Sequence, residues 1–409
     1  MIVGLLKNNA LSVFRILIPL LSLPILSRAL TQVDLGNYAA VISVSAWVFL
    51  VCEYGLSVTA TRIMSKARVF PFQLYWDSIY VKLFIGIIIA LVVITGSFLF
   101  KLVPSVMLLG WLIGFLQSFT PNWVFISSNE YYKLILSDII AQLLMLLIGL
   151  FVLVFQYSNW LVYTSLYAVI IFIQIFILNF LVIHKYDVKY SSSNLVSIIT
   201  ILRSGANIFL NRLVSSFYTA LGGFSVYAVA GAAAAANFSN TDRLTKVINS
   251  VNDVSVNSLL GRTTKLFSSG EDIRYIVRRI LIFLLIVNAL FLIVLDLNAT
   301  VIVSVIFGNS YIGMEKYVRI YSFVLIPIAY TYTIGILWLN SISQEKYFTV
   351  SISITLLILF GPTIYFLKMS GLMGYIYGIV AIEYTNAVVL TVILLNKSIY
   401  PFQKRSIAT

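Results

Sequence analysis

The chain consists largely of long apolar runs that follow one another from residue 10 to residue 395. A helix rises about 1.5 Å per residue and the hydrocarbon layer of a bilayer is about 30 Å thick, so roughly 20 apolar residues can cross it. Hydrophobic residues make up 61% of the 409 residues and charged residues only 10%, too few for the polar surface of a soluble protein. The sequence therefore predicts an all-α integral membrane protein.

About twelve runs have the length of a membrane span. The first six are Ala10 to Leu30, Tyr38 to Ser57, Ser78 to Phe100, Val103 to Phe125, Leu134 to Phe155 and Trp160 to Ile183. The last six are Gly205 to Tyr227, Ala235 to Leu259, Val277 to Leu297, Val318 to Asn340, Phe348 to Leu367 and Leu372 to Leu395. We expect the first run to be retained, because it is too long for the core of a signal peptide. The basic loop after the sixth run predicts two six-helix lobes, residues 1–190 and 191–409.

The loops between these runs differ in charge. Lys and Arg are concentrated in alternate loops, at roughly a three-to-one ratio, and such cations are held on the cytoplasmic side during insertion. With the N-terminus inside, the basic loops include those of Arg62, Lys133 and Lys185. An even number of spans then places both termini in the cytoplasm.

The sequence lacks the parts of common catalytic sites. Its one cysteine, Cys52, and one histidine, His184, provide neither an internal disulfide nor a His-based metal cluster. No segment between spans reaches the roughly 50 residues of a catalytic or nucleotide-binding domain, and GxxxxGK[ST], HExxH and GxSxG motifs are absent. The net charge of +13 is scattered between spans, which argues against nucleic acid. We therefore expect a transporter with no metal or cofactor, rather than an enzyme.

Ionisable residues inside the predicted spans are candidates for function. Each costs a few kcal/mol at mid-depth, so such side chains usually face water or a partner. The set is Arg15, Glu53, Lys82, Asp138, Arg212, Asp242, Arg243, Lys246, Asp253 and Glu383. For those near span ends, such as Arg15, Glu53 and Lys82, the alternative is a long side chain that reaches the interface.

The seventh and eighth runs are the most polar of the chain. In the eighth, Arg243 and Lys246 share a helix face, and Asp242 and Lys246 are an i, i+4 pair. We expect this stripe, together with Arg212, to line an aqueous path and to offer cations to a phosphate group. The alternative is a set of salt bridges between helices.

Embedded carboxylates are candidates for ion coupling, since a carboxylate can alternate between charged and neutral forms. The candidates are Glu53, Asp138, Asp242, Asp253 and Glu383. A proton or a sodium ion would suit any of them. The glycine pairs Gly110/Gly114 and Gly374/Gly378 predict close helix packing instead of chemistry.

Several short motifs in a fixed order resemble a known family. They are Pro19 and Pro24 with Ser27-Arg28-Ala29-Leu30, Leu35-Gly36-Asn37-Tyr38, Glu53-Tyr54-Gly55-Leu56 with Thr61-Arg62, Thr120-Pro121-Asn122-Trp123-Val124-Phe125, Ala236-Asn237-Phe238-Ser239 with Asp242-Arg243-Leu244, and Ile306-Phe307-Gly308 with Tyr311. The series resembles the O-antigen and polysaccharide flippases (Wzx-type) of the multidrug/oligosaccharidyl-lipid/polysaccharide (MOP) exporter superfamily.

The resemblance implies a V-shaped fold of twelve helices, similar to that of the MATE transporters. It implies transfer of an undecaprenyl-pyrophosphate-linked oligosaccharide, used in lipopolysaccharide synthesis, from the cytoplasmic to the periplasmic leaflet of the bacterial inner membrane. Arg212, Arg243 and Lys246, with Arg15 and Arg62, would then bind the pyrophosphate. Implied partners are the bilayer, the O-antigen polymerase and the chain-length regulator.

Two other functions remain open from the sequence. A cation-coupled multidrug exporter of the same superfamily would favour acidic and aromatic cavity residues. A membrane enzyme such as an O-antigen polymerase would carry a large periplasmic loop, whereas the longest outer segment expected here, Asn298 to Tyr317, has about 20 residues.

Overall fold

The computed structural model of the protein describes residues 18, 21–67, 69–99 and 102–403. The described residues are helical almost throughout and contain no strand, as predicted. They form two compact units, Met1–Ala236 and Asn237–Thr409. The first unit holds α2 (Gln32–Glu53), α3 (Leu56–Met64), α4 (Phe72–Leu99), α5 (Pro104–Ser118), α6 (Asn122–Ser127), α7 (Tyr131–Val154), α8 (Trp160–Tyr186) and α9 (Leu195–Ala230).

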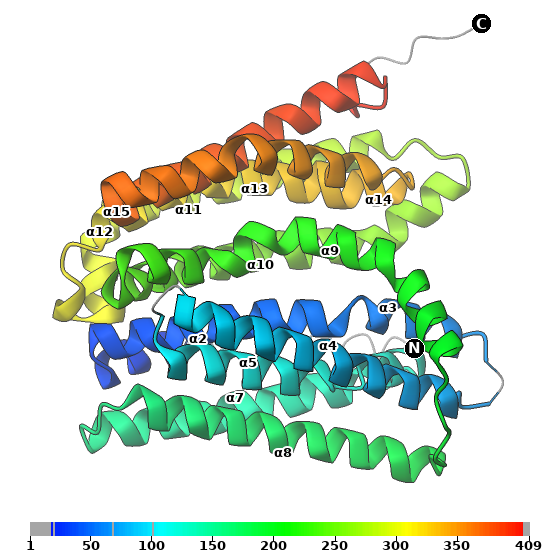
Figure 1. The fold of residues 1–409 in the computed structure, drawn as a ribbon. Helices are drawn as coiled ribbons and strands as arrows, with labels where there is room; N and C mark the ends of the chain where they lie inside the picture. The colour runs from blue at the N-terminus through cyan, green and yellow to red at the C-terminus, as the bar shows by residue number, and fades with distance from the viewer. Residues whose placement is uncertain (1–17, 19–20, 68, 100–101, 404–409) are drawn as a thin grey trace, which may run out of the picture. The chain divides into compact units, whose positions relative to one another are not determined.

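The second unit begins within α10 (Ala232–Ser268). It continues with α11 (Arg274–Phe307), η1 (Asn309–Tyr311), α12 (Glu315–Tyr321), η2 (Ser322–Val324), α13 (Leu325–Thr331), the π-helix η3 (Tyr332–Trp338), α14 (Leu339–Ser341) and α15 (Lys346–Asn396). Figure 1 shows the helices of both units and labels most of them.

Among the described residues, seven helical stretches are long and apolar enough to cross a membrane, or eight if the bent helix α9 is included. The 51 residues of α15 form two predicted spans, because the chain turns at Gly371 (φ 60°, ψ −149°). A Cβ atom on Gly374 would lie 2.2 Å from the carbonyl oxygen of Phe366, so the two halves of α15 pack closely. The predicted span Ala10 to Leu30 is described at residues 18 and 21–30, and residues 21–29 are helical.

Large apolar side chains on the outside of these helices are typical of a membrane protein. On α4, Phe84, Leu91 and Phe98 are all well exposed. A soluble protein rarely exposes apolar patches of this extent, whereas lipid accommodates them.

Three predicted boundaries differ from the structure. The run Tyr38 to Ser57 is not one helix, because Tyr54 and Gly55 adopt left-handed backbone angles between α2 and α3. The run Val103 to Phe125 is divided between α5 and α6 before Pro121, which has no N–H to donate. The expected outer loop after Leu297 is shorter than predicted, because α11 continues to Phe307 with only a kink at Asn298.

Helix α2 lies at the centre of the first unit, beside α5, α4 and α9 (Figure 1). The predicted packing role of Gly110 and Gly114 is confirmed here. A Cβ atom on Gly114 would lie 2.2 Å from the carbonyl oxygen of Ser45, and one on Gly110 would lie 2.6 Å from Val44. The glycines therefore allow the backbones of α5 and α2 to approach closely.

Helix α9 lies in the first compact unit. The lobes of residues 1–190 and 191–409 expected from the sequence are a division by span number, which these compact units do not test. Helix α9 contacts α2, α3 and α4. The hydroxyl group of Tyr227 donates to Asn37 Oδ1 over 3.0 Å near one end of α9, and a Cβ atom on Gly223 would lie 2.3 Å from Ser43 Oγ. These contacts explain why the boundary between the units falls after α9. The two six-helix halves remain a prediction about topology.

The second unit is built around contacts of α11 with α12, α13 and η3, and of α15 with α12 and α13. Asn252 on α10 and Asn288 on α11, both fully buried, exchange two amide hydrogen bonds of 3.3 and 2.7 Å. Buried amides of this kind are costly unless paired, so the exchange fixes the register between α10 and α11.

Candidate functional site

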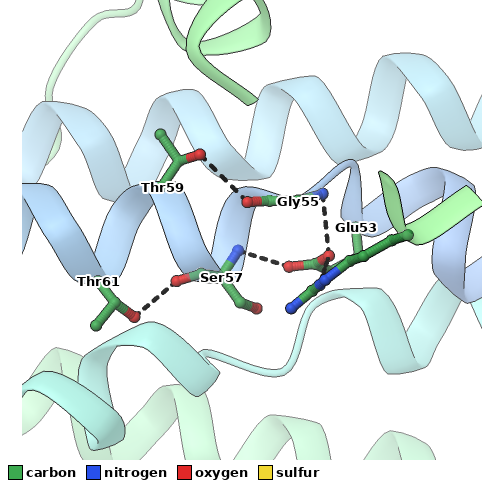
Figure 2. A network of polar contacts seen from close by, with 6 residues as sticks. Glu53, Gly55, Ser57, Thr59 and Thr61 are labelled. Carbon is green, nitrogen blue, oxygen red and sulfur yellow. Dashed lines mark hydrogen bonds and ion pairs between the residues drawn. The ribbon is translucent and has the colours of Figure 1, made fainter. Parts of the chain in front are cut away.

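Glu53 occupies the break between α2 and α3. Its carboxylate turns back to accept hydrogen bonds from Gly55 N over 3.0 Å and from Ser57 N over 2.5 Å (Figure 2). The first N–H groups of a helix have no partner within the helix, and its N-terminus favours negative charge. Glu53 therefore stabilises the start of α3 from the end of the preceding helix.

The same carboxylate forms an ion pair with Arg212 on α9. Nη1 of Arg212 donates to Oε2 of Glu53 over 2.7 Å. The side chain of Glu53 is 3% exposed, whereas that of Arg212 is 42% exposed. Lys82 on α4 is also buried and interacts electrostatically with Glu53. A buried acid thus holds a cation whose side chain remains partly exposed.

One face of α9 positions Arg212 against this break. The face carries Gly205, Ile208, Phe209 and Arg212, spaced at i, i+3, i+4 and i+7. The ring of Phe209 stacks on Tyr54 with centroids 4.5 Å apart. A Cβ atom on Gly205 would lie 3.0 Å from the carbonyl oxygen of Tyr54. The location of Arg212 is therefore set by packing as well as by charge.

In the second unit, Asp242 and Lys246 on α10 form the predicted i, i+4 ion pair, with 2.6 Å between Oδ2 and Nζ. Their side chains are 20% and 58% exposed, respectively. The adjoining face of α10 is buried at Thr241, Thr245 and Asn252. The polar stripe predicted for this helix thus lies on its accessible side, and a second polar face points into the unit.

Asp242 also accepts a hydrogen bond of 3.0 Å from the hydroxyl group of Tyr321 on α12. The ring of Phe238 forms T-shaped contacts with Tyr321 and Tyr375, with ring centroids 6.0 and 5.2 Å apart, respectively. Glu383 on α15 is buried and interacts electrostatically with Tyr321. Sequence reasoning did not find these tyrosines, because aromatic residues at span ends are expected to form the interfacial belt of a membrane protein.

The remaining predicted residues lie in different surroundings. Asp138 on α7 accepts from Nε2 of Gln174 on α8 over 2.9 Å, which links two neighbouring helices. Asp253 is exposed and accepts from Asn257 over 2.8 Å, one turn further along α10. The last three candidate cations are Arg243, which is half-buried, Arg62, which is exposed in the last turn of α3, and Arg15, which lies outside the described residues.

Each unit contains a cation paired with a carboxylate. In the first unit Arg212 on α9 pairs with Glu53, and in the second Lys246 on α10 pairs with Asp242. Guanidinium and ammonium groups donate several hydrogen bonds and bind phosphate oxygens well. Among the described residues, no group of three or more His, Cys, Asp and Glu side chains is placed to hold a metal ion. From their chemistry, the cationic side chains of these pairs are expected to bind an anion.

Comparison with models of known protein families identifies the family of this chain. The model of a family described as polysaccharide biosynthesis protein matches residues 9–267, well over half of the chain. The chain belongs to this polysaccharide biosynthesis protein family. The sequence resemblance to polysaccharide flippases is thereby confirmed. A search of curated proteins found no match.

Solved structures show which fold this member of the polysaccharide biosynthesis family has. Lipid II flippase MurJ in an inward closed conformation matches with a TM-score of 0.75 at 15% identity, over 97% of this chain and 88% of that chain. An inward-facing multidrug resistance MATE family transporter of the MOP superfamily matches with a TM-score of 0.64 at 14% identity, over 94% of both chains. A MOP superfamily transporter from Pyrococcus furiosus matches with a TM-score of 0.56 at 12% identity, over 97% and 92%.

These matches show the architecture of this family member. It is a multi-pass membrane protein of the polysaccharide biosynthesis protein family, with the fold of the MATE and MurJ structures. Most of the predicted fold class is confirmed by this likeness. At 12 to 15% identity the likeness gives the fold alone.

Proposed function

We propose that the chain is a flippase for undecaprenyl-pyrophosphate-linked oligosaccharide repeat units of the O-antigen type. It carries them by alternating access from the cytoplasmic to the periplasmic leaflet of the bacterial inner membrane, with both of its termini in the cytoplasm. The observation that supports this most directly is that Arg212 and Lys246, on the polar helices α9 and α10, present partly exposed cationic side chains backed by carboxylates.

The physical need for such cations follows from the substrate. A polar oligosaccharide with a doubly phosphorylated head cannot cross hydrocarbon unaided, while its lipid tail can stay in the bilayer. Each cation compensates part of the head-group charge, and this compensation is stronger within the membrane than in bulk water. Arg212, Arg243 and Lys246 are the cations we assign to this role, with Arg15 and Arg62 as further candidates.

Ion coupling and partners complete the proposal. An inward gradient of protons or sodium ions supplies the driving force, and it acts through one of the acids Glu53, Asp138, Asp242, Asp253 and Glu383. The O-antigen polymerase and the chain-length regulator act on the delivered repeat unit. No ATP-binding domain is needed in such a mechanism.

The test is delivery of lipid-linked sugar by charge-reversed variants. Arg243→Glu and Lys246→Glu should abolish surface polysaccharide, with the lipid-linked repeat unit trapped in the cytoplasmic leaflet. The measurement is polysaccharide profiling combined with leaflet-specific labelling of the glycan. Lys265→Glu is the matched control, since Lys265 is an exposed cation in the last turn of the same helix α10, and its reversal should leave delivery intact.

Two results would contradict the proposal. Wild-type delivery by both charge-reversed variants would show that these cations serve the structure only. Glycan that reaches the periplasmic leaflet but is not polymerised would instead indicate that the protein is a membrane enzyme such as an O-antigen polymerase.

A cation-coupled drug exporter is the second candidate. The observation that favours it is the buried carboxylate of Glu383 beside aromatic residues of the second unit, a suitable setting for an organic cation. Efflux of a cationic dye from cells that lack glycan substrate, abolished by Glu383→Gln, would support this function over the flippase.

A further inference from the structure

Glu53 has two kinds of partner at once. Its oxygens accept from two backbone N–H groups at the start of α3, over 3.0 and 2.5 Å, and from Arg212 over 2.7 Å. The backbone partners are fixed by the left-handed residues Tyr54 and Gly55, so the carboxylate cannot follow Arg212 if Arg212 moves. Glu53 is therefore a fixed acid, and Arg212 is the adjustable member of the pair.

Packing around the pair supports this asymmetry. Gly55 lies so close to α9 that a Cβ atom there would be 3.0 Å from Ile208, and Glu53 itself is almost fully buried. The Arg212 side chain is more than a third exposed, and its guanidinium carries five N–H donors. An anion that approaches from the exposed side must share this guanidinium with Glu53.

We infer that Glu53 is a positioning residue that acts through Arg212: its buried carboxylate competes with the anionic head group for the guanidinium and keeps head-group binding weak enough to be reversed. A carrier has to release what it binds. A head group that is bound as tightly after transport as before it is released slowly. The built-in acid restores Arg212 to the α2–α3 break each time the head group leaves. This inference rests on the proposed function of Arg212 in binding phosphate.

The direction in which one substitution changes the binding affinity distinguishes this role from a structural one. Glu53→Gln keeps the shape and one acceptor oxygen but removes the charge that competes for Arg212. The purified full-length protein should then bind undecaprenyl pyrophosphate about tenfold more tightly, a difference typical of one nearby charge. Loss of packing or of the start of α3 would weaken binding instead.

Transport should change in the opposite direction. In proteoliposomes that contain undecaprenyl-pyrophosphate-linked glycan, Glu53→Gln should lower KM and lower kcat together, because tighter binding is accompanied by slower release. Uncharged undecaprenol serves as the control ligand, and its binding should not respond to the substitution. Asp77→Asn is the control variant, because it removes another buried acid of the first unit and should leave affinity for the pyrophosphate unchanged.

The possible outcomes are distinct. Equal or weaker binding by folded Glu53→Gln overturns the inference while the proposed function stands, provided that Arg212→Gln still weakens pyrophosphate binding in the same assay. Wild-type affinity in Arg212→Gln overturns the assignment of Arg212, and this inference with it. If Glu53→Gln does not fold, Glu53→Asp carries the test: its carboxylate is withdrawn from Arg212 by one methylene, so binding should tighten by a smaller factor, and unchanged affinity would overturn the inference.

Discussion

At the scale of single residues, two of the embedded carboxylates, Asp242 and Glu53, each combine an ion pair with further hydrogen bonds. Asp242 forms an ion pair with Lys246 and accepts a hydrogen bond from the hydroxyl group of Tyr321. Glu53 forms an ion pair with Arg212 and accepts hydrogen bonds from two backbone N–H groups. A charge removed from water is tolerated only where such partners satisfy it. The partners therefore matter as much as the charges that the sequence shows.

Asp242 allows the ion pair and the tyrosine hydrogen bond to be separated. Asp242→Asn loses the charge but keeps an oxygen for Tyr321, so stability should fall by less than about 1 kcal/mol. Asp242→Ala leaves the buried Tyr321 hydroxyl group without this acceptor and should cost about 1 to 3 kcal/mol. Thermal unfolding of the purified protein in detergent measures both, and equal Tm values for the two variants would contradict the argument.

At the scale of helices, the apolar runs predicted where the elements lie but not where they break. Hydropathy reports the length of a run, and the runs through Glu53 and through Pro121 are continuous. The breaks come from local chemistry: Tyr54-Gly55 supplies two left-handed residues, and Pro121 lacks an N–H. The Tyr54-Gly55 pair is a signal that could have been read from the sequence.

The packing of α5 on α2 gives a prediction at this scale. Gly114→Ala brings a methyl group against the carbonyl oxygen of Ser45, a backbone atom that cannot swing aside, and should cost about 1 to 3 kcal/mol. Gly96→Ala is the control, because nothing lies within 4 Å of its Cβ position on α4. Alanine there should be neutral or stabilising by up to about 1 kcal/mol. Comparison of Tm values decides, and a similar effect at both glycines would refute close packing as the cause.

Glu130, just before α7, links this helix to the end of α8. It lies 3.1 Å from Lys133 Nζ and 2.8 Å from Lys185 Nζ. Partial burial raises the pKa of Glu130, but hydrogen bonds from Lys185 and Lys133 outweigh this effect, and the pKa is lowered. The ion pairs of Glu130 therefore stabilise the folded protein fully above the ordinary pKa of Glu, about 4.3. This stabilisation is lost as the pH falls through the lowered pKa of Glu130 in the folded protein.

A pH series of Tm values tests this link. Wild type should unfold at a higher temperature than Glu130→Gln at neutral pH, and the difference should disappear as the medium becomes acidic. A difference that grows toward acidic pH would show the opposite sign of the pKa shift.

At the scale of the whole molecule, composition alone predicted the class of protein, while the site depended on contacts between distant residues. Glu53 and Arg212 were both named from the sequence as embedded charges, but 159 positions separate them, so their pairing could not be predicted from spacing. The Asp242–Lys246 pair could be predicted, because helical periodicity alone brings i and i+4 together.

The predicted topology can be tested on the whole chain. A fluorescent protein fused after residue 409 should fluoresce, because both termini are expected in the cytoplasm. Alkaline phosphatase fused after Ser158, between α7 and α8, should be active, because this loop is expected on the periplasmic side. Inactive phosphatase at Ser158 together with a non-fluorescent C-terminal fusion would show the opposite orientation in the membrane.

The one cysteine of the chain, Cys52, is completely buried beside Val48 and Met107 in the core of the first unit. A thiol shielded in this way does not compete for reagents that act from solution. New cysteines placed on the surface can therefore be labelled with spin probes or fluorophores in the otherwise native chain. Distances between two such labels, one in each unit, would test directly whether the units move as the proposed alternating access requires.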